Sequence, residues 1–535
     1  MHTRPLLAVA LALLFLASCA RPAALTDTLI IDQQREPMSL NAALENGASS
    51  TELGLLLFNY LVKFDDRGRL VGDIATTVPT LANGGISSDG TTITYHLRAG
   101  VRFADGTPLT ARDCVYSIDA ILNPANNVQS RYGYDRIARA DAPNATTLVL
   151  HLREPFAPLI TLVLAPQGYP ILPAHLLASK PNFNHIAFDD APIGGGPYVV
   201  AHWYHGDRIE LTANPYYFRG VPSIKHVTIR FVSDSGTAVN QLHTGEANGL
   251  FNDLDMGNVP LIAAIPQMRL LRTPVNAVGS LIYNTQDPIT GDPRVRRALT
   301  QAIDIPSLVA KAYRGAVDAA GAGRGLFEWA YDPRAPLTAP YDPAAARALM
   351  RSAGWRTGSG GIRTKNGKRL AVLMLIQADT PGDEIIGSAI QQAERAIGVD
   401  VSLKAYEVTQ FAAPAQSGGP IYGGKFQMAL YPFVNGDDPD VTDQFGCANI
   451  PPNGYNKPRY CDPALDALMK AARTTYDPAR RLALYARIQE RLSRALPMVL
   501  LYQRREIDAF SSRIHGPTGS VSSVLWNIGA WSMSP

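Results

Sequence analysis

The chain has 535 residues and carries few of the signatures that mark enzymes or nucleic-acid-binding proteins. Walker P-loop, HExxH, GxSxG and cysteine–histidine nucleophile patterns are all missing from it. Lysine and arginine form no run of five or more, and the formal net charge is only +3. This charge pattern argues against nucleic acid as the main partner. The sequence therefore predicts a protein that is not an enzyme and that needs no cofactor or metal ion.

Long apolar stretches are also scarce. Residues 6–16 form an apolar run of export-signal length that is too short to cross a bilayer, which takes roughly 20 residues, and no other stretch reaches that length. The run ends in Leu-Ala-Ser before Cys19, which resembles a bacterial lipobox. We expect residues 1–18 to be a lipoprotein signal peptide, Cys19 to carry the lipid and residues 19–26 to form a tether. The protein would then be exported to the periplasm or the outer face of the cytoplasmic membrane and held there only by its lipid. The alternative is an ordinary secretory signal with a chance cysteine.

Cysteine is rare, with four residues in all. Besides Cys19, the chain contains Cys114, Cys447 and Cys461. In an oxidising compartment cysteines are expected to pair, and Cys447 and Cys461 flank a polar, turn-rich segment. We therefore expect a disulfide between Cys447 and Cys461, which would add roughly 3 kcal/mol on the chain-entropy model. Cys114 stands in an apolar stretch and is expected to be a buried thiol.

Strand-like and helix-like segments alternate along the rest of the chain, which predicts an α/β fold. Residues 91–97 show the alternation and β-branched content of a strand, and Thr110 is a good N-cap for a helix over residues 111–122. Residues 293–313 are expected to form a helix that breaks at Pro306. Further helices are expected within residues 53–64 and at 344–353, 384–397 and 478–496, and further strands at 27–31, 209–211, 227–232, 369–376 and 399–406.

The most informative segment is residues 86–122, ISSDGTTITYHLRAGVRFADGTPLTARDCVYSIDAIL, in which a strand ending in LRAGVRF leads into DGTPLTA. Further segments of the same character follow at residues 195–198, 213–224, 243–246, 283–304, 341–355, 435–440, 459–473 and 484–502. In this order they resemble the family 5 extracellular solute-binding proteins, the oligopeptide- and dipeptide-binding group. The resemblance covers nearly the whole chain after the signal peptide.

The resemblance implies a two-lobed periplasmic-binding-protein fold of the cluster C type, with a hinge and a central ligand cleft. Lobe I would span residues 27–272, including an extra subdomain over about 64–185. Lobe II would span 273–501, and residues 502–535 would return to lobe I. It also implies the function: a monomeric receptor that captures a small solute, plausibly a peptide, and delivers it to an ABC permease with a cytoplasmic ATPase.

The segment NGDDPD, residues 435–440, would border the cleft. Peptide-binding relatives have a tryptophan here and, three residues later, an aspartate for the ligand's ammonium group, and the matching positions are Pro432 and Asn435. Dipeptide-specific relatives place an arginine after a lobe II strand that ends in glutamine, and here Ala378 stands in its place. Both charged groups are therefore missing at these positions, although Asp437 or Asp438 could take over if the loop is shifted.

The expected ligand-binding residues come from both lobes. Those in lobe I match a segment whose backbone could pair with an extended solute, whereas Tyr431 and Phe433 could stack on an uncharged one. The full set is Glu45, Asn46, Gly47, Ala378, Tyr431, Phe433, Asn435, Gly436, Asp437 and Asp438. Three functions stay open: a receptor for longer or modified peptides, a receptor for an uncharged solute such as an oligosaccharide, and a sensor or adhesion lipoprotein outside transport.

Overall fold

The computed structural model describes residues 27–45, 48–251, 256–319, 325–378, 380 and 382–535, and its central feature is one mixed sheet of 11 strands. Across the sheet the strands are β17 (Asp400–Tyr406), β16 (Ala371–Gln377), β18 (Met428–Val434), β11 (Met268–Tyr283), β19 (Met498–Ser511), β10 (Gly249–Leu250), β1 (Thr28–Gln33), β9 (His226–Phe231), β8 (Arg208–Ala213) and β7 (Tyr198–Tyr204), and β12 (Val317–Ala319) pairs with β19. The predicted α/β class is confirmed.

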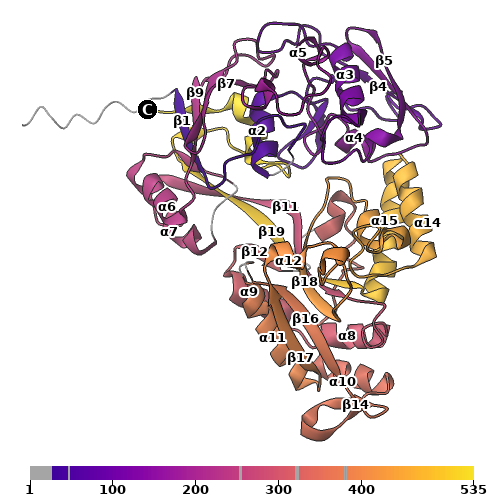
Figure 1. Ribbon diagram of the computed structural model, residues 1–535. Coiled ribbons are helices and arrows are strands. Elements are labelled where there is room, and N and C mark those ends of the chain that lie inside the picture. Colours follow the sequence, from indigo (N-terminus) through magenta and orange to yellow (C-terminus); the bar gives the residue numbers. More distant parts are fainter. Residues whose placement is uncertain (1–26, 46–47, 252–255, 320–324, 379, 381) are drawn as a thin grey trace, which may run out of the picture.

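The buried apolar side chains form cores in two separate bodies at the two ends of this sheet (Figure 1). We call lobe I the body whose core is drawn from residues 29–251 and 510–533. We call lobe II the body whose cores are drawn from residues 278–502. The end of the chain thus packs beside its beginning, in lobe I.

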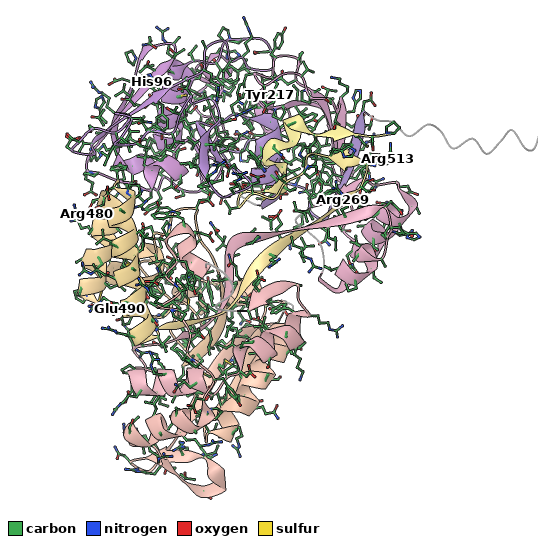
Figure 2. All side chains as sticks on the ribbon, turned by 180° about the vertical axis from the view of Figure 1, so that it is seen from behind. His96, Tyr217, Arg269, Arg480, Glu490 and Arg513 are labelled. Atoms are coloured by element: carbon green, nitrogen blue, oxygen red, sulfur yellow. A yellow bond between two sulfur atoms is a disulfide. The ribbon has the colours of Figure 1, made fainter. Side chains whose placement is uncertain are left out.

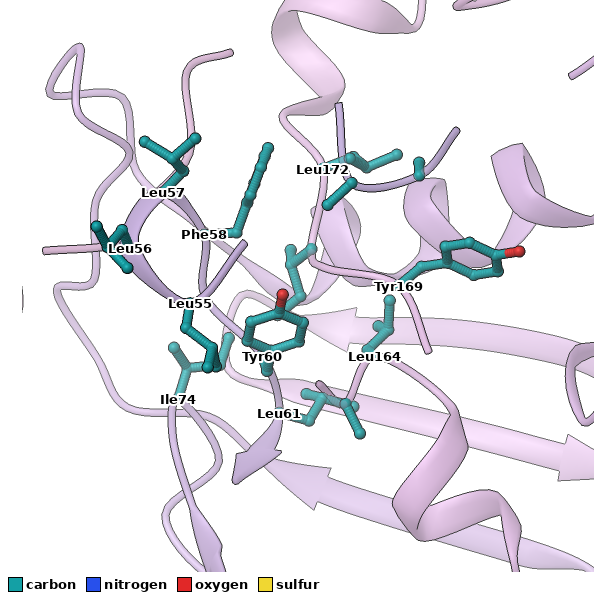
Figure 3. Close-up of a cluster of buried hydrophobic side chains, with 14 of the residues drawn as sticks. Leu55, Leu56, Leu57, Phe58, Tyr60, Leu61, Ile74, Leu164, Tyr169 and Leu172 are labelled. Carbon is teal, nitrogen blue, oxygen red and sulfur yellow. The ribbon is translucent and has the colours of Figure 1, made fainter. Parts of the chain in front are cut away.

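The lobe I core is dense around the chain that follows α2 (Ala48–Leu57), where Phe58, Tyr60 and Leu61 are buried against Leu164 and Leu172 (Figure 3). A three-stranded sheet, β4 (Thr92–His96), β6 (Thr147–Leu152) and β5 (Ile137–Asn144), extends this lobe. The remaining elements of lobe I are β2 (Val62–Phe64), β3 (Leu70–Gly72), α3 (Ala111–Leu122), α4 (Leu159–Leu162), α5 (Ala174–Leu177), α6 (Ser235–Thr244), α7 (Val259–Ala263), η8 (Val524–Ala530) and the pair β20 (Ile514–His515) and β21 (Ser532–Met533).

Lobe II packs helices on both faces of its part of the sheet. Alternation along β11 sends Leu281 and Tyr283 to one face and Ile282 to the other. The first face is covered by α8 (Pro293–Gln301), α9 (Ile305–Tyr313), α10 (Pro343–Ser352) and α11 (Asp383–Ala396). The second is covered by η4 (Gly325–Ala330), α12 (Val408–Phe411), α13 (Thr442–Phe445), α14 (Pro463–Thr474) and α15 (Pro478–Ala495). A small sheet of β13 (Arg356–Thr357), β14 (Arg363–Lys365) and β15 (Lys368–Arg369) lies at the far tip (Figure 1).

Two long antiparallel strands, β11 and β19, run from one lobe into the other (Figure 1). Their pairing is regular in lobe I, but the register shifts between Pro274 and Val278, opposite Arg505 and Gln503. A shift of this kind is a β-bulge, which bends a strand locally. The bulge therefore lies where the chain passes between the lobes.

The helix predicted over residues 111–122 is confirmed at both ends. Its cap Thr110 donates its backbone N–H to Asp113 Oδ2 at 2.8 Å, which completes a capping box. The expected break at Pro306 is wrong, because the break lies at residues 302–304 and Pro306 stands in the first turn of α9. Proline is tolerated there, since the first-turn N–H has no partner inside the helix, and Asp304 caps that helix.

The predicted disulfide between Cys447 and Cys461 is present in the structure. Cys114 is a free thiol that is buried in lobe I, as expected, and burial raises its pKa. Cys19 and the expected signal peptide lie outside the described residues. None of the described helices combines the length and the apolar character needed for a bilayer crossing.

Candidate functional site

The segment NGDDPD follows the carboxyl end of β18 and lies where lobe II faces lobe I. Its first residue, Asn435, turns into lobe II: its Nδ2 donates to Leu326 O at 2.9 Å, and its Oδ1 accepts from Gln444 Nε2 at 2.7 Å. Gly436 follows, and its carbonyl accepts a hydrogen bond from Asn276 Nδ2. The Asn435 amide is thus engaged on both sides by the protein itself.

The two acidic residues that come next differ in how their charge is balanced. Asp438 is buried and bound through both carboxylate oxygens by Arg481 Nη2, at 2.9 and 2.8 Å, with Tyr485 donating a further hydrogen bond at 3.3 Å. Arg481 also lies over the ring of Trp329, 5.3 Å from its centroid. Asp438 therefore belongs to a neutralised ion pair.

Asp437 is only 4% exposed and has no cationic partner within the described structure. Its Oδ1 accepts from Asn276 Nδ2 at 3.1 Å, whereas its Oδ2 is buried without a hydrogen-bond partner among the described residues. Burial, together with the negative charges of Glu328 and Asp438, raises the pKa of Asp437 to about 8. The charged form of this carboxyl group is therefore disfavoured, and its Oδ2 stays buried without a hydrogen bond from the described residues.

Asp437 lines a cavity of about 550 Å³ between the lobes, which we call the apolar chamber. This volume is within the usual range for a small-molecule site. Apolar side chains supply most of its lobe I wall, and lobe II contributes two aromatic residues and several charged groups. The wall consists of Phe64, Gly68, Leu70, Val78, Pro79, Thr80, Leu81, Ala82, Ile86, Ala157, Ile160 and Thr161 from lobe I, and Trp329, Asp437, Asp438, Tyr476, Asp477, Pro478 and Arg481 from lobe II.

A second cavity of about 470 Å³, the hinge chamber, lies beside the two crossing strands. Its wall contains more charged residues than the wall of the apolar chamber. Among them, Arg505 forms an ion pair with Asp318 through two hydrogen bonds of 2.7 Å each. Its wall consists of Asp66, Arg67, Gly68, Leu271, Arg272, Thr273, Pro274, Asp318, Glu328, Gln503, Arg505, Gly519 and Val521. Gly68 lines both chambers, so the two cavities meet at this residue.

The consecutive residues Glu328 and Trp329 separate the chambers on the lobe II side. Glu328 lines the hinge chamber, whereas Trp329 lines the apolar chamber. Trp329 is 41% exposed. The backbone of Glu328 has φ 41° and ψ −119°, a conformation that a residue with a side chain rarely adopts. Strain of this kind is retained where the surrounding structure requires it, often at ligand clamps.

Contacts on the side opposite the hinge strands bring the lobes together across the chambers. Asp437 N–H donates to Gln167 Oε1 of lobe I at 2.8 Å, and Ala157 N–H of lobe I donates to Arg473 O of lobe II at 2.7 Å. Two further hydrogen bonds join Phe156 to Tyr476 and Tyr132 to Asp440. Figure 2 shows Arg480, near the start of α15, at the end of that helix that approaches lobe I.

Two of the other expected site residues, Glu45 and Ala378, line neither chamber. The Glu45 carboxylate accepts the backbone N–H groups of Met38 and Ser39, at 2.9 and 3.1 Å, so it holds its own loop. Ala378 is exposed just past β16, and its N–H donates to Tyr406 O. Asn46 and Gly47 are outside the described residues.

The two aromatic residues expected to stack on a ligand pack inside lobe II instead. Phe433 is 5% exposed, and its ring lies 4.9 Å from that of Tyr431. The Tyr431 ring is stacked on Phe411 and lies 5.0 Å from Lys457 Nζ. The aromatic residues that line the apolar chamber are Phe64, Trp329 and Tyr476. The sequence did not single out Trp329, which follows a glycine-rich stretch that reads only as a loop.

Metal binding has little support in this region. Among the described residues, no group of three or more histidine, cysteine, aspartate or glutamate side chains is placed to hold a metal ion.

Comparison with known proteins agrees with this geometry. Residues 76–450 match the model of the bacterial extracellular solute-binding proteins, family 5 middle region. The glutathione-binding protein GsiB of Escherichia coli K12 is 26% identical over 521 residues, covering 96% of both chains.

Two solved structures show the same fold. The ABC transporter substrate-binding protein CtaP of Listeria monocytogenes superposes with a TM-score of 0.82 at 21% identity, covering 95% of this chain and 99% of that one. The oligopeptide-binding protein AppA of Bacillus subtilis, in complex with a nonapeptide, gives a TM-score of 0.73 at 23% identity with the same coverage.

Proposed function

The chain belongs to the family 5 bacterial extracellular solute-binding proteins, and on this premise we propose that it binds a peptide or peptide-like solute between its lobes for an ABC importer. The observation that carries the proposal is the pair of adjoining chambers whose walls come from both lobes, while only β11 and β19 cross between them in the described structure. A solute held there is enclosed by closure of a hinge.

A peptide is favoured because relatives along most of the chain are named as glutathione-binding and oligopeptide-binding proteins. The chambers support this choice, since an apolar compartment and a charged one suit the side chains and the polar main chain of a peptide. An oligosaccharide stacked on Tyr431 and Phe433 has no such support, because those rings pack in lobe II. We also propose that the protein has no catalytic activity, as expected of a family of binding proteins.

The hinge formed by β11 and β19 supports a division of the chain into two lobes. We propose lobe I at residues 27–272 with its subdomain at about 64–185, lobe II at 273–501, and a return to lobe I at 502–535. The distribution of the cores and the bulge after Pro274 support these boundaries. We also propose that the protein is a monomer that docks on a membrane permease.

We further propose that the exported protein is anchored through a lipid on Cys19. Replacing Cys19→Ser removes the thiol that would be acylated, and the variant should be released from the membrane fraction. If the Cys19→Ser protein stays as membrane-bound as the wild type, the anchor proposal is wrong.

A thermal-shift screen tests the ligand class. A ligand present at 100 times its dissociation constant adds about 2.7 kcal/mol to the free energy of unfolding. We expect peptides of two to nine residues to raise the melting temperature and oligosaccharides to leave it unchanged. A shift with oligosaccharides alone would replace the peptide assignment.

A further inference from the structure

Positive charge is concentrated at the far tip of lobe II. Residues 343–370, which include α10 and the small sheet of β13, β14 and β15, contain seven lysine and arginine residues and no aspartate or glutamate. The formal net charge of the whole chain, in contrast, is only +3. The basic side chains of this segment that reach solvent, together with Arg395 of α11, are called the basic tip. They are Arg347, Arg351, Arg356, Lys365, Lys368, Arg369 and Arg395.

The basic side chains lie close together although they come from different elements. Arg347 of α10 donates to Ala396 O, at the end of α11, at 3.1 Å. Arg363 of β14 is buried, and its Nε donates to Ile397 O at 2.6 Å, just past the same helix end. Burial, followed by the positive charges of Arg351 and Arg347, lowers the pKa of Arg363. The small sheet is thus fixed against α10 and α11, with like charges gathered around the junction.

Negative charge nearby balances only part of this cluster. Asp400 forms ion pairs with both Arg369 and Arg395, at 3.1 and 3.5 Å, so one carboxylate serves two cations. The exposed members of the basic tip without an ion pair to another described residue are Arg347, Arg351, Arg356 and Lys368. Most of the positive charge therefore remains available to a partner.

The small sheet contributes little to the core of lobe II. Within residues 356–369 the buried side chains are Ile362 and Arg363. The turn between β14 and β15 has φ 53° at Asn366 and 76° at Gly367, as a tight two-residue hairpin requires, so Lys365 and Lys368 are held opposite each other. The sheet therefore holds charged side chains out toward solvent.

The exposed surface of the tip has no apolar centre. Residues 343–370 contain no exposed large hydrophobic side chain, and Trp355 is buried. The centre of a protein–protein interface is enriched in aromatic side chains and depleted in lysine, and single-stranded nucleic acid stacks its bases on exposed aromatic rings. A layer of lipid headgroups needs neither, because basic residues are attracted to it by charge alone.

We infer that the basic tip binds the anionic headgroups of a phospholipid bilayer. Figure 1 shows β1, at the start of the described chain in lobe I, and β14 at opposite ends of the molecule. A lipid on Cys19 at one end and the basic tip at the other would lay both lobes along the membrane that holds the permease. The inference rests on the proposed export to the membrane surface and does not depend on which solute is bound.

Co-sedimentation with lipid vesicles tests the inference. The protein is the unacylated Cys19→Ser variant, so that an attached lipid does not dominate binding. We expect it to bind vesicles that contain phosphatidylglycerol and not vesicles of phosphatidylcholine alone. Binding should be lost when the salt concentration rises from about 0.1 M to about 1 M, because the Debye length then falls from about 10 Å to about 3 Å.

Substitutions then assign the binding to the tip. Each basic residue near an anionic bilayer strengthens binding by a factor of about five, so combining Arg351→Gln, Arg356→Gln and Lys368→Gln should weaken it about a hundredfold. Replacing the two arginines by lysine keeps the charge and should leave binding unchanged. The matched control removes the same charge at exposed sites elsewhere and should bind like the parent protein. It combines Arg112→Gln, Lys180→Gln and Arg487→Gln.

Three results would overturn the inference: equal binding to both kinds of vesicle, no binding to the anionic vesicles at low salt, or an equal loss in the tip and control variants. Binding only to vesicles that also carry the importer's permease would overturn it as well, because the partner would then be that protein. The vesicle experiment contains no peptide, so its failure leaves the receptor proposal standing. Failure of the thermal-shift screen, in turn, leaves the result with vesicles unaffected.

Discussion

Among the residues that the structure describes, buried carboxyl groups without a cation occur at more than one place, and Asp437 lines the apolar chamber. Glu394 of α11 is a contrasting case in the core of lobe II. It is 0% exposed, and neither carboxylate oxygen has a hydrogen-bond partner among the described residues. Burial raises its pKa well above the usual value. Glu394 is therefore held as a neutral acid at a cost to stability.

The first prediction is that Glu394→Met stabilises the protein by about 1–3 kcal/mol near pH 7, because methionine fills a similar volume without an unsatisfied polar group. Urea denaturation measures this. The folded pKa is raised, so the stability of the wild type is fully present below the unfolded pKa near 4.5 and falls as pH rises toward the folded value. The gain should therefore be larger at pH 8 than at pH 4.5.

The control for this prediction is Glu384→Met, at an exposed glutamate of the same helix. It should leave the pH dependence of stability unchanged. A wild type that becomes more stable from pH 5 to pH 8, with no difference in slope for Glu394→Met, would contradict the assignment of Glu394 as a buried neutral acid.

Among the elements, strand β11 links the hinge to the candidate site. Its bulge lies beside Asn276, whose Nδ2 donates to Gly436 O and to Asp437 Oδ1, at 3.2 and 3.1 Å. Asn276 O in turn accepts the N–H of Asn435 at 2.7 Å. A change in the bend of β11 would therefore act directly on the loop that carries Asp437.

Across the chambers from this strand, Gln167 supplies one of the lobe I contacts to the same loop. We predict that Gln167→Ala weakens binding of the peptide with the largest thermal shift about fivefold, the equivalent of one hydrogen bond of about 1 kcal/mol. The free protein should also show a larger radius of gyration in X-ray scattering, since a contact that holds the lobes together is lost. Gln129→Ala, at an exposed glutamine of lobe I, is the control. Unchanged affinity and size for Gln167→Ala would show that this contact does not hold the lobes.

Elements with strong local signals could be predicted from the sequence. The Thr110 cap and the helix after it are an example, because the capping box is made by residues three positions apart. The long strands β11 and β19 were not predicted. In β11 the Thr273–Pro274 step reads as a break in a strand, and only pairing with β19, more than two hundred residues later, keeps the segment extended.

At the scale of the whole molecule, the candidate site depends on contacts that no local pattern specifies. Tyr431 and Phe433 share a face of β18 because they are two residues apart, but the sequence does not say whether that face meets the core or a ligand. The structure turns it inward, onto Phe411. Trp329 and Asp437 belong to segments far apart in the chain. They line one chamber because η4 packs on β11 and the loop after β18 is bonded to η4 by Asn435 Nδ2, which donates to Leu326 O.

The separate cores of the two lobes explain how the strands β11 and β19 can serve as a hinge. Each lobe has cores of its own, so the lobes can move relative to each other without exposing those side chains. The hydrogen bonds of Gln167, Ala157 and Tyr132 close the opposite side. A solute that contacts both walls favours this closed arrangement, which is how differential binding drives closure.

Native mass spectrometry of the purified, full-length protein tests the central claim most directly. The protein is incubated with an equimolar mixture of peptides of two to nine residues and a mixture of oligosaccharides, and the mass of each retained solute is read from the intact complex. We predict one peptide per protein chain and no retained oligosaccharide. Retention of oligosaccharides without peptides, or of neither class, would contradict the account.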